Sequence, residues 1–414
     1  MGKKILVLGL GQNNFLSFLY TKLKKHNSAF IISAPYFTEI NAESNNDFWM
    51  YENNGIEKEK SFLSIFKSVC ICLFSRHFYQ TFFFIFFAEG KMGKALHFLY
   101  KQMQAKTFFI QNKNFENYDT FHFHFMQYSY LRELFLVPKN KKIVCTFWGS
   151  DLLRTNDILN FYFVKKALNR ATIITCQSDE LKEIIMAKFG RNLLDKIQIS
   201  IFPVSEKIYD YMDLNYTNKK AIDHFKSNYS YSNDKINVLI GHNGSPFNNH
   251  LKIINSLQSI RNKNKIHLIV NLNYAITENE KKSYKITLTE ALNKSGCSYV
   301  ILEKFFVDEE LSISRLASEI FIHAPISDAL SGTMLELLYA SNIVITGAWL
   351  PYNTFKTAEL SYFEINNFTE LSEKMDAIID HIESEKERTS KNKLLVRDAF
   401  ISEKIIQKWD QILS

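Results

Sequence analysis

The first half of the chain alternates short apolar runs with stretches in which apolar residues recur at helical spacing. The apolar runs predict strands at Lys4–Gly9, Ala29–Ser33, Thr107–Ile110, Thr120–His124, Lys142–Phe147, Thr172–Cys176 and Ile197–Pro203. The helical spacing predicts helices at Asn14–Lys25, Tyr128–Leu136, Ile158–Arg170 and Ser178–Lys188. Strands that alternate with helices pair in parallel, so this half predicts a Rossmann-like sheet covered on both faces.

The second half repeats the alternation. Its predicted strands are Ile236–Gly241, Ile266–Asn271, Tyr299–Glu303, Ile320–His323 and Ile343–Gly347, with helices beginning at His250, Glu278, Asp308 and Ser331. The fold class that follows is α/β, with two Rossmann-like doubly wound domains. In such a pair the carboxyl ends of both sheets are expected to face one cleft, where ligands bind.

A polar, tyrosine-rich stretch after Ser205 interrupts the pattern, and 414 residues are too many for one ordinary core. We therefore predict an N-terminal domain, a linker, a C-terminal domain and a terminal helix that can pack back on the first domain. These parts span residues 1–205, 206–233, 234–385 and 386–414.

Charge and cysteine usage narrow the classes of partner. The net charge of +7 favours anionic substrates or an anionic membrane face, and it falls short of a nucleic-acid-binding footprint. Five scattered cysteines without Cys-x-x-Cys spacing predict neither a zinc site nor a disulfide framework, but reduced thiols in a cytoplasmic protein. Glycine breaks the first apolar run early, so that run is read as a strand and not as a signal peptide.

The segment from Phe62 to Ala88 is the most apolar part of a chain that contains 36 phenylalanines. Lys67, Arg76 and His77 interrupt it, and its longest unbroken piece is too short to cross a bilayer. Two interpretations stay open: a pair of buried helices, or an aromatic and basic surface that lies peripherally on the inner face of the plasma membrane.

The stretch from Phe321 to Tyr352 carries the most specific chemistry. A strand ends in a polar turn that contains Asp328, and Ser331 then opens an apolar-faced helix. The start of a helix presents unpaired N–H groups and a positive dipole end, which suits a phosphate. Asp328 and Glu336 suit sugar hydroxyls, because carboxylates accept strong hydrogen bonds from O–H donors.

The pattern therefore indicates a nucleotide-sugar pocket. The alternative is that Asp328 caps the helix and Glu336 lies on a solvated face.

Other polar positions lie at the ends of predicted strands. Asp119–His124 places two histidines at the end of one strand, Trp148–Asp151 and Gly241–Pro246 follow two others, and Asn248–His250 begins the next helix. His122 and His124 share one face of their strand, because successive side chains point to opposite faces. A hydrogen-bonded edge of the core is the alternative account of that pair.

Four of these motifs resemble the GT-B glycosyltransferases. The spacing of Asp328 and Glu336 is similar to the E-x7-E signature of the retaining family 4 enzymes, with Asp in place of the first Glu. Asp119-x-x-His122-x-His124 matches the D-x-x-H-x-H pattern of the same family.

The remaining motifs extend the resemblance along the chain, from Gly9 to Tyr352. The loop Trp148–Asp151 matches the family's H-G-x-D loop with Trp for His. Together with Val238–His250 it also resembles the bacterial transferases that add 4-acetamido-4,6-dideoxygalactose to lipid-linked enterobacterial common antigen.

The resemblance implies a role for each matching residue. Asp328 would hold the donor sugar, Ser331 and Gly332 would offer N–H groups to the diphosphate, and Glu336 would bind the ribose. The other predicted donor-binding residues are Thr333, Gly241, Asn243, Gly244 and Lys304. Lys304 is included because the Arg and Lys that the family usually carries in the first C-terminal loop are missing here.

On the acceptor side, the resemblance places His124, or alternatively His122, beside the transferring sugar. If the stereochemistry is inverting, His124 and Asp151 are the candidate general bases; if it is retaining, His124 only orients the sugar. Gly9-Leu10-Gly11-Gln12-Asn13-Asn14 lacks the third glycine of a dinucleotide fingerprint, so Gly11, Gln12 and Asn13 are read as an acceptor-side loop. No Asp-x-Asp pair is found, which predicts metal-independent catalysis with no cofactor beyond the donor.

The expected protein is a cytoplasmic glycosyltransferase of bacterial surface polysaccharide synthesis, such as lipopolysaccharide or capsule, with a lipid-linked or saccharide acceptor and no nucleic-acid partner. One alternative is a non-catalytic sugar-binding or assembly subunit on the same fold. Another is an NAD(P)-dependent oxidoreductase, which is disfavoured because no acidic residue ends the second predicted strand at Ser33.

Overall fold

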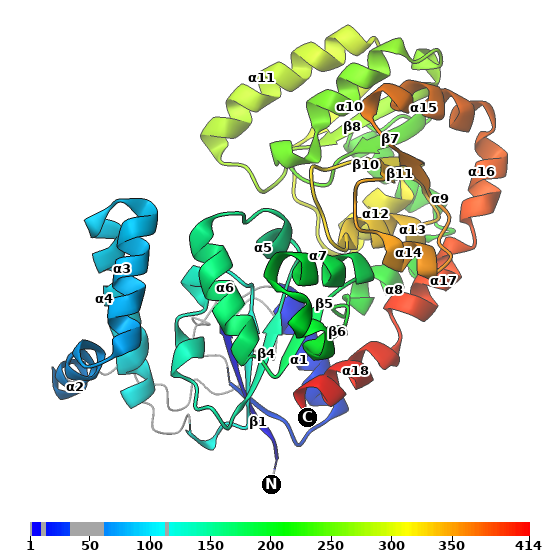
Figure 1. The fold of residues 1–414 in the computed structure, drawn as a ribbon. Helices are drawn as coiled ribbons and strands as arrows, with labels where there is room; N and C mark the ends of the chain where they lie inside the picture. The colour runs from blue at the N-terminus through cyan, green and yellow to red at the C-terminus, as the bar shows by residue number, and fades with distance from the viewer. Residues whose placement is uncertain (1, 10–13, 34–61, 112–115) are drawn as a thin grey trace. The chain divides into compact units, whose positions relative to one another are not determined.

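The computed structural model describes residues 2–9, 14–33, 62–111 and 116–414 (Figure 1). The chain forms two compact units. The first contains Met1–Pro203 and Glu403–Ser414, and the second contains Val204–Ser402. Each unit holds one six-stranded sheet. The predicted α/β fold class is therefore confirmed.

The sheet of the first unit has the order β2-β1-β3-β4-β5-β6, and every neighbouring pair is parallel. Its strands are β1 Lys4–Gly9, β2 Ile31–Ser33, β3 Thr120–His124, β4 Lys142–Thr146, β5 Ile173–Cys176 and β6 Ile197–Ile199. The helices are α1 Asn14–His26, α2 Phe62–Leu73, α3 Arg76–Glu89, α4 Met92–Gln111, α5 Ser150–Leu153, α6 Ile158–Arg170, α7 Asp179–Phe189 and α18 Glu403–Leu413.

Three predictions in this unit are corrected. Thr107–Ile110 is the end of α4 and not a strand, because a short apolar run fits a strand as well as a turn of helix. Tyr128–Leu136 forms two 3₁₀ turns, η3 Tyr128–Tyr130 and η4 Glu133–Leu136, instead of one α-helix. Of the strand expected at Ile197–Pro203, only the first three residues pair.

The sheet of the second unit has the order β12-β11-β10-β7-β8-β9 and is also parallel throughout. Its strands are β7 Ile236–Ile240, β8 Ile266–Asn271, β9 Ser298–Leu302, β10 Ile320–His323, β11 Ile343–Gly347 and β12 Phe363–Ile365. The helices are α8 Glu206–Asn215, α9 Lys219–Asn228, α10 His250–Ser256, α11 Glu278–Ser295, α12 Asp308–Leu316, α13 Gly332–Tyr339, α14 Asn353–Thr357, α15 Leu371–Asp380, α16 Ile382–Thr389 and α17 Asn392–Phe400.

The stretch predicted as a linker, residues 206–233, carries α8 and α9 and lies within the second unit. The chain passes from one unit to the other between Pro203 and Val204. The sequence did not predict these helices, because each buries only a few apolar residues on one face. The buried residues are Ile208, Tyr209 and Met212 on α8, and Phe225 on α9.

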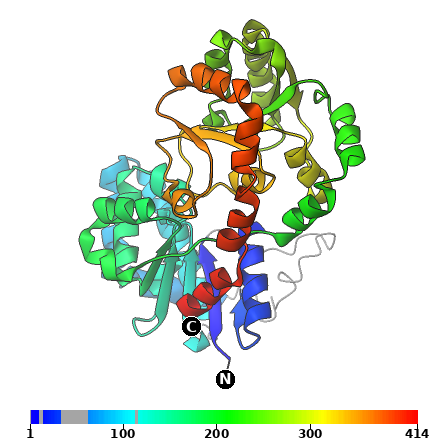
Figure 2. The same cartoon turned by 90° about the vertical axis from the view of Figure 1, so that its right-hand side faces the viewer.

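The terminal helix α18 packs on α1 within the first unit (Figure 2). Trp409 is fully buried in a core that includes Tyr20, and its indole N–H donates to the Ile201 carbonyl over 2.8 Å. Asn27 donates to both carboxylate oxygens of Asp410 over 3.3 Å. The last residues of the chain therefore complete the core of the unit that contains the first ones.

Among the described residues, no single helix has the length and apolar composition to cross a bilayer. One bent pair meets that test jointly: Phe66–Leu73 with Phe78–Glu89, at an angle of 75°.

Candidate functional site

Apart from Lys304, the predicted donor residues of the second unit lie where its strand order reverses. Strand β7 pairs with β8 on one side and with β10 on the other, so the loops that follow β7 and β10 leave the same edge of the sheet and then diverge. A topological switch point of this kind is the usual ligand site of an open α/β sheet.

Two hydrogen bonds join these loops. Asn249 donates from Nδ2 to the Ala324 carbonyl over 2.8 Å, and the Ile326 amide donates to the Phe247 carbonyl over 2.9 Å. Asn249 has a left-handed backbone (φ 57°), which Asn tolerates better than most residues. These two hydrogen bonds therefore hold the loops after β7 and β10 against each other.

The predicted glycines of the β7 loop allow close approach. Gly241 has φ +63°, and a Cβ there would lie 2.5 Å from Nε2 of the buried His250. A Cβ at Gly244 would lie 2.6 Å from the Ile276 side chain. Asn243 holds the turn between these contacts, because its Oδ1 accepts from the Ser245 amide over 2.9 Å.

Asp328 lies in the loop after β10 with three hydrogen bonds. Its Oδ2 is 3.0 Å from His323 Nε2 and accepts from the Tyr352 hydroxyl at 3.0 Å, while its Oδ1 accepts from the Ala329 amide at 2.8 Å. Burial acts to raise the pKa of Asp328, but the His323 hydrogen bond and charge outweigh it, so the pKa falls below its usual value. The carboxylate is held charged, and its side chain keeps 28% exposure.

Two imidazoles beside Asp328 have unpaired nitrogens. Nδ1 of His323 and Nδ1 of His242 are buried, and neither has a hydrogen-bond partner among the described residues. The two ring centroids are 5.5 Å apart. Burial and the neighbouring His323 lower the pKa of His242 to about 3, so its ring is neutral. Buried polar atoms normally have partners, and orphans of this kind mark a place where a ligand can supply one.

Helix α13 begins at this site. Ser331 caps it by accepting from the Met334 amide over 3.1 Å. Gly332 and Thr333, the first helical residues, have N–H groups that no residue four positions earlier in a helix can accept. The predicted helix start is therefore formed, with Asp328 three residues before the cap Ser331, and phosphate binding there stays a prediction.

Glu336 is bound by a cation that the sequence did not reveal. Nε and Nη2 of Arg315, on α12, each lie 2.9 Å from Glu336 Oε2. The two side chains are 8% and 18% exposed, so Glu336 is not a solvated surface residue. Among the described residues, no hydrogen bond to its Oε1 is found.

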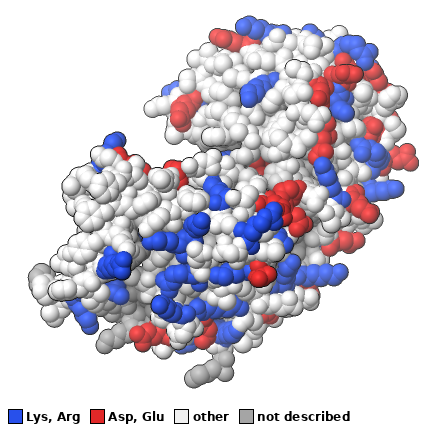
Figure 3. Space-filling view, viewed as in Figure 1, with Lys and Arg blue, Asp and Glu red and all other residues white. Residues whose placement is uncertain are grey.

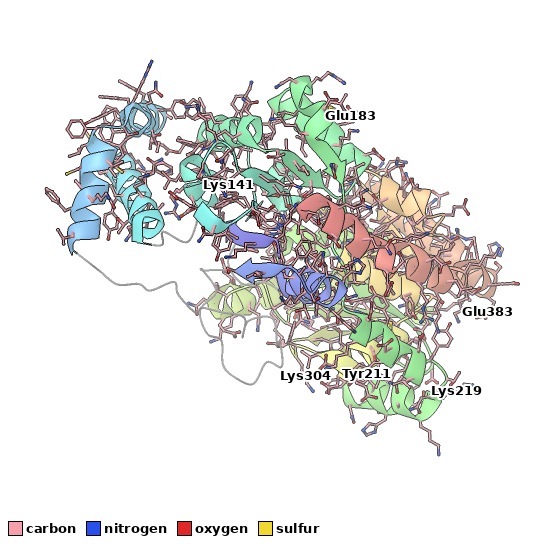
Figure 4. All side chains as sticks on the ribbon, turned by 90° about the horizontal axis from the view of Figure 1, so that it is seen from below. Lys141, Glu183, Tyr211, Lys219, Lys304 and Glu383 are labelled. Atoms are coloured by element: carbon pink, nitrogen blue, oxygen red, sulfur yellow. The ribbon has the colours of Figure 1, made fainter. Side chains whose placement is uncertain are left out.

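Lys304 does not join this cluster through any contact that the structure shows. Lys304 lies on the loop that follows β9 (Figure 4). Its Nζ donates to Glu310 over 2.7 Å and to the Tyr229 hydroxyl over 2.5 Å. Its place beside the donor diphosphate stays a prediction, and Arg315 is the cation adjacent to Glu336.

In the first unit, His122 and His124 are fully buried on β3 and share one partner. The Tyr20 hydroxyl, on α1, lies 2.8 Å from His122 Nδ1 and 2.6 Å from His124 Nε2. Burial lowers the pKa of His122 to about 3 and that of His124 well below its usual value. Both rings are therefore neutral at physiological pH.

The remaining contacts determine which atom donates in each hydrogen bond of this network. The Trp148 indole can only donate, so His124 Nδ1 accepts from it over 3.3 Å and the ring proton lies on Nε2. His124 then donates to Tyr20, Tyr20 to His122 Nδ1, and His122 Nε2 to Thr146 Oγ1 over 2.7 Å. Every ring nitrogen of the pair is engaged. This placement favours the hydrogen-bonded core, and a catalytic role of either histidine stays a prediction.

Asp151 is buried and binds backbone amides of two loops. It accepts from the Met126 amide over 2.7 Å and from the Trp148 amide over 2.9 Å. Burial raises its pKa to about 6 although these amides act to lower it. Asp151 thus ties the end of β3 to the turn after β4, and its action as a general base is untested.

The predicted acceptor-side residues Gly11, Gln12 and Asn13 lie outside the described residues. Within the described residues, no group of three or more His, Cys, Asp or Glu side chains comes together in a way that could hold a metal ion.

Sequence reasoning missed Arg315, His242, His323 and Tyr352. The two histidines had a weak signal, because each stands at the end of an apolar strand. Arg315 and Tyr352 had none, since their partners are 21 and 24 residues away in sequence.

No protein-family model matches the sequence, and no curated protein matches it significantly. Solved structures do resemble the fold. Over all of this chain and 98% of the other, the TM-score is 0.64 with a glycosyltransferase from Rickettsia africae ESF-5, at 14% identity. Anabaena HepE in complex with UDP-glucose gives 0.63 at 10% identity, with 100% and 99% covered.

A third neighbour is the α,α-trehalose 6-phosphate synthase of Burkholderia multivorans, with a TM-score of 0.64 at 12% identity and 100% and 98% of the two chains covered. At these identities the likeness establishes the fold. It is that of the GT-B glycosyltransferases, as the sequence predicted.

Proposed function

We propose that this protein is a glycosyltransferase that moves a sugar from a nucleotide-sugar donor to a lipid-linked or saccharide acceptor. The observation that carries the proposal is the grouping, at the switch point of the second sheet, of a charged Asp328, two unpaired imidazole nitrogens and the start of α13. The similarity to HepE in complex with UDP-glucose supports it.

The donor is proposed to lie along α13. The N–H groups of Gly332 and Thr333 bind the diphosphate, because the helix dipole favours negative charge there. Asp328 accepts from hydroxyls of the sugar, and Oε1 of Glu336 accepts from the ribose. Arg315 orients Glu336 through the contacts of Nε and Nη2 with Oε2.

The reaction breaks the bond between the anomeric carbon and a diphosphate oxygen and forms a bond from that carbon to an acceptor oxygen. Negative charge develops on the departing diphosphate, and fixed N–H dipoles stabilise it without reorganisation. The acceptor hydroxyl loses its proton as its oxygen forms the new bond to the anomeric carbon. The three described groups considered as its base, His122, His124 and Asp151, are all engaged, which favours transfer to the departing diphosphate.

The finer assignments are also proposals. A role in bacterial surface polysaccharide synthesis, such as lipopolysaccharide or capsule, fits the resemblance to the transferases of enterobacterial common antigen. Metal independence fits a site in which a helix start meets the diphosphate. A cytoplasmic location fits the reduced, unpaired cysteines.

The test is a panel of nucleotide sugars, beginning with UDP-glucose, assayed by calorimetry for binding and by release of nucleoside diphosphate for turnover. Asp328→Asn and Glu336→Gln remove one charge each at nearly constant shape. We expect both variants to stay folded and to lose turnover by roughly 10²-fold or more, as for removal of a group that stabilises developing charge.

Asp308→Asn is the matched control. Asp308 is an exposed acid of the same unit that pairs with Lys207 over 2.6 Å. Full turnover in Asp328→Asn and Glu336→Gln, or an equal loss in Asp308→Asn, would refute the proposal. Assays with and without a chelator test metal independence, and the anomeric configuration of the product distinguishes retention from inversion.

A second candidate function follows from the engaged state of His122, His124 and Asp151: a sugar-binding or assembly subunit that does not catalyse transfer. It predicts that a nucleotide sugar binds and is released unchanged, with no diphosphate formed in the presence of any acceptor.

A further inference from the structure

Helices α2–α4 carry much of the exposed apolar surface of the protein. Of the 25 large hydrophobic side chains that are exposed among the described residues, eleven fall between Leu63 and Tyr100. Soluble proteins seldom expose large contiguous apolar patches unless the patch binds something.

Helix α3 has two distinct faces. Its inner face packs on α6, where Ile85 is 1% exposed and the Phe84 ring stacks on Tyr162 with centroids 3.8 Å apart. Its outer face presents Tyr79, Phe83 and Phe87, four residues apart and 44%, 52% and 78% exposed. This stripe is therefore a second apolar face on a helix whose core face is already satisfied.

The neighbouring helices repeat the arrangement. Leu63 and Phe66 lie exposed on α2, and Phe74 at the turn into α3 is 92% exposed. Met92, Leu96 and Tyr100 form a stripe of the same four-residue spacing on α4.

The charges of this segment are nearly all positive. Residues 62–111 contain a single acidic residue, Glu89, which pairs with Lys94 over 2.7 Å. The basic residues are Lys67, Arg76, Lys91, Lys94, Lys101 and Lys106. On the face drawn in Figure 3 these helices are mostly uncharged, with a few Lys and Arg side chains among them.

A groove of about 640 Å³ lies between α3 and α6. Tyr79, Phe83 and Phe87 line it, and its cations are Arg76 and Lys166, with no acidic residue. Aromatic walls with cations beside them suit a hydrocarbon chain that ends in an anionic headgroup.

We propose that α2–α4 form a docking surface for an anionic phospholipid bilayer, with the aromatic stripes at the level of the acyl chains and the lysines at the headgroups. Interfacial helices combine aromatic and basic residues in this way. A second copy of the chain is the poorer occupant, because a symmetric contact would bring the same cations face to face. The proposal does not depend on sugar transfer.

The test measures binding of the full-length protein to sedimented vesicles, either of phosphatidylcholine alone or with phosphatidylglycerol added. We expect binding to the anionic vesicles that weakens as salt rises. The double variant Lys67→Gln/Lys91→Gln should lose roughly 25-fold in affinity, since each juxtamembrane cation contributes about fivefold.

Phe83→Ser/Phe87→Ser removes the exposed aromatic stripe and should abolish binding while the thermal unfolding midpoint stays unchanged. The matched control is Lys219→Gln/Ile286→Ser, which changes an exposed lysine and an exposed isoleucine of the second unit and should bind as the parent does. A folding defect of the phenylalanine variant does not remove the test, because the lysine variant keeps the apolar face.

Equal binding to both vesicle types, no binding to either, or parental binding by both surface variants would overturn the proposal. So would a dimer of the parent protein in solution that Phe83→Ser/Phe87→Ser converts to a monomer, since a second copy would then be the occupant. The readout is vesicle binding alone, so a failed transfer assay leaves this result interpretable.

Discussion

Arg315 and Glu336 join helices α12 and α13 through an ion pair that includes one hydrogen bond. Both Nε and Nη2 of the guanidinium lie 2.9 Å from Oε2, and neither side chain is more than 18% exposed. Charge-assisted bonds of this kind are about twice as strong as neutral ones, and the fork of Arg fixes the orientation of its partner. Oε1 is thereby left for a hydroxyl donor.

Removing one partner of this pair should be costly. We expect Arg315→Ala to lower the free energy of unfolding by about 3 kcal/mol, because Glu336 would lose its cationic partner at a position where its side chain is 18% exposed. Arg315→Ala/Glu336→Ala should lose less than the sum of the single variants. Urea denaturation at neutral pH measures all three.

The control is Lys386→Ala on α16. Lys386 pairs with Glu383 over 3.1 Å, but the two side chains are 44% and 82% exposed. Exposed pairs contribute at most about 1 kcal/mol, so this variant should unfold close to the parent. A similar decrease in the free energy of unfolding in Arg315→Ala and Lys386→Ala would show that the buried pair stabilises the fold no more than the exposed one.

Buried neutral histidines predict a protein that loses stability in mild acid. Burial lowers the pKa of His122 and His242 to about 3 and that of His250 to about 4, from an ordinary value of 6.5. Between those values the unfolded chain binds protons that the folded one does not, so stability falls as pH falls below 6.5. Each histidine contributes a slope of about 1.4 kcal/mol per pH unit.

Asp151 acts in the opposite direction over part of this range. Burial raises its pKa from 3.8 to about 6, so between these values the folded state binds the extra proton and gains stability as pH falls. One carboxyl offsets one histidine, and the net slope keeps the sign set by the histidines.

Urea denaturation at several pH values between 7.5 and 4.5 measures the slope. His122→Gln should reduce it, and His224→Gln, at an exposed position of α9, should not. Stability that is flat or that rises toward acid would contradict the assignment of neutral rings.

The sequence could predict what is encoded locally. The turn with Asp328, the cap at Ser331 and the helix that follows lie within a dozen residues, and their spacing alone defines the start of α13. The face shared by His122 and His124 likewise follows from alternation along one strand.

Tertiary partners could not be predicted in this way. Tyr20, which bonds both histidines, is 102 residues from His122 and comes from another helix, so the spacing left the choice between core and catalysis open. Thr107–Ile110 was read as a strand because its apolar run is short. In the structure it is the last turn of α4, a helix that begins at Met92.

Asp151 should prove more important for the fold than an ordinary helix cap. Asp151→Ala would leave the Met126 and Trp148 amides without their acceptor, at about 1–3 kcal/mol each. Asp157→Ala is the comparison: Asp157 caps α6 through the Asn160 amide, and its loss should cost about 1 kcal/mol.

Asp151→Asn separates structure from catalysis, because an amide oxygen can still accept from one loop but cannot take a proton. Turnover close to the parent's in a folded Asp151→Asn protein would exclude Asp151 as general base. A loss of turnover with unchanged donor affinity and unchanged unfolding would instead support that role.

Gly241→Ala tests whether the tight turn after β7 shapes the donor site. The residue has φ +63°, which costs an L-residue roughly 1–2 kcal/mol, and the added Cβ would lie 2.5 Å from His250 Nε2 on a fully buried ring. We expect lower stability together with weaker nucleotide-sugar binding, measured by urea denaturation and calorimetry.

Gly93→Ala is the control, since a Cβ there meets nothing within 4 Å in α4 and should raise stability by up to about 1 kcal/mol. Parental stability and donor affinity in Gly241→Ala would mean that the β7 turn tolerates a side chain, and the contact between Gly241 and His250 would then have no part in forming the site.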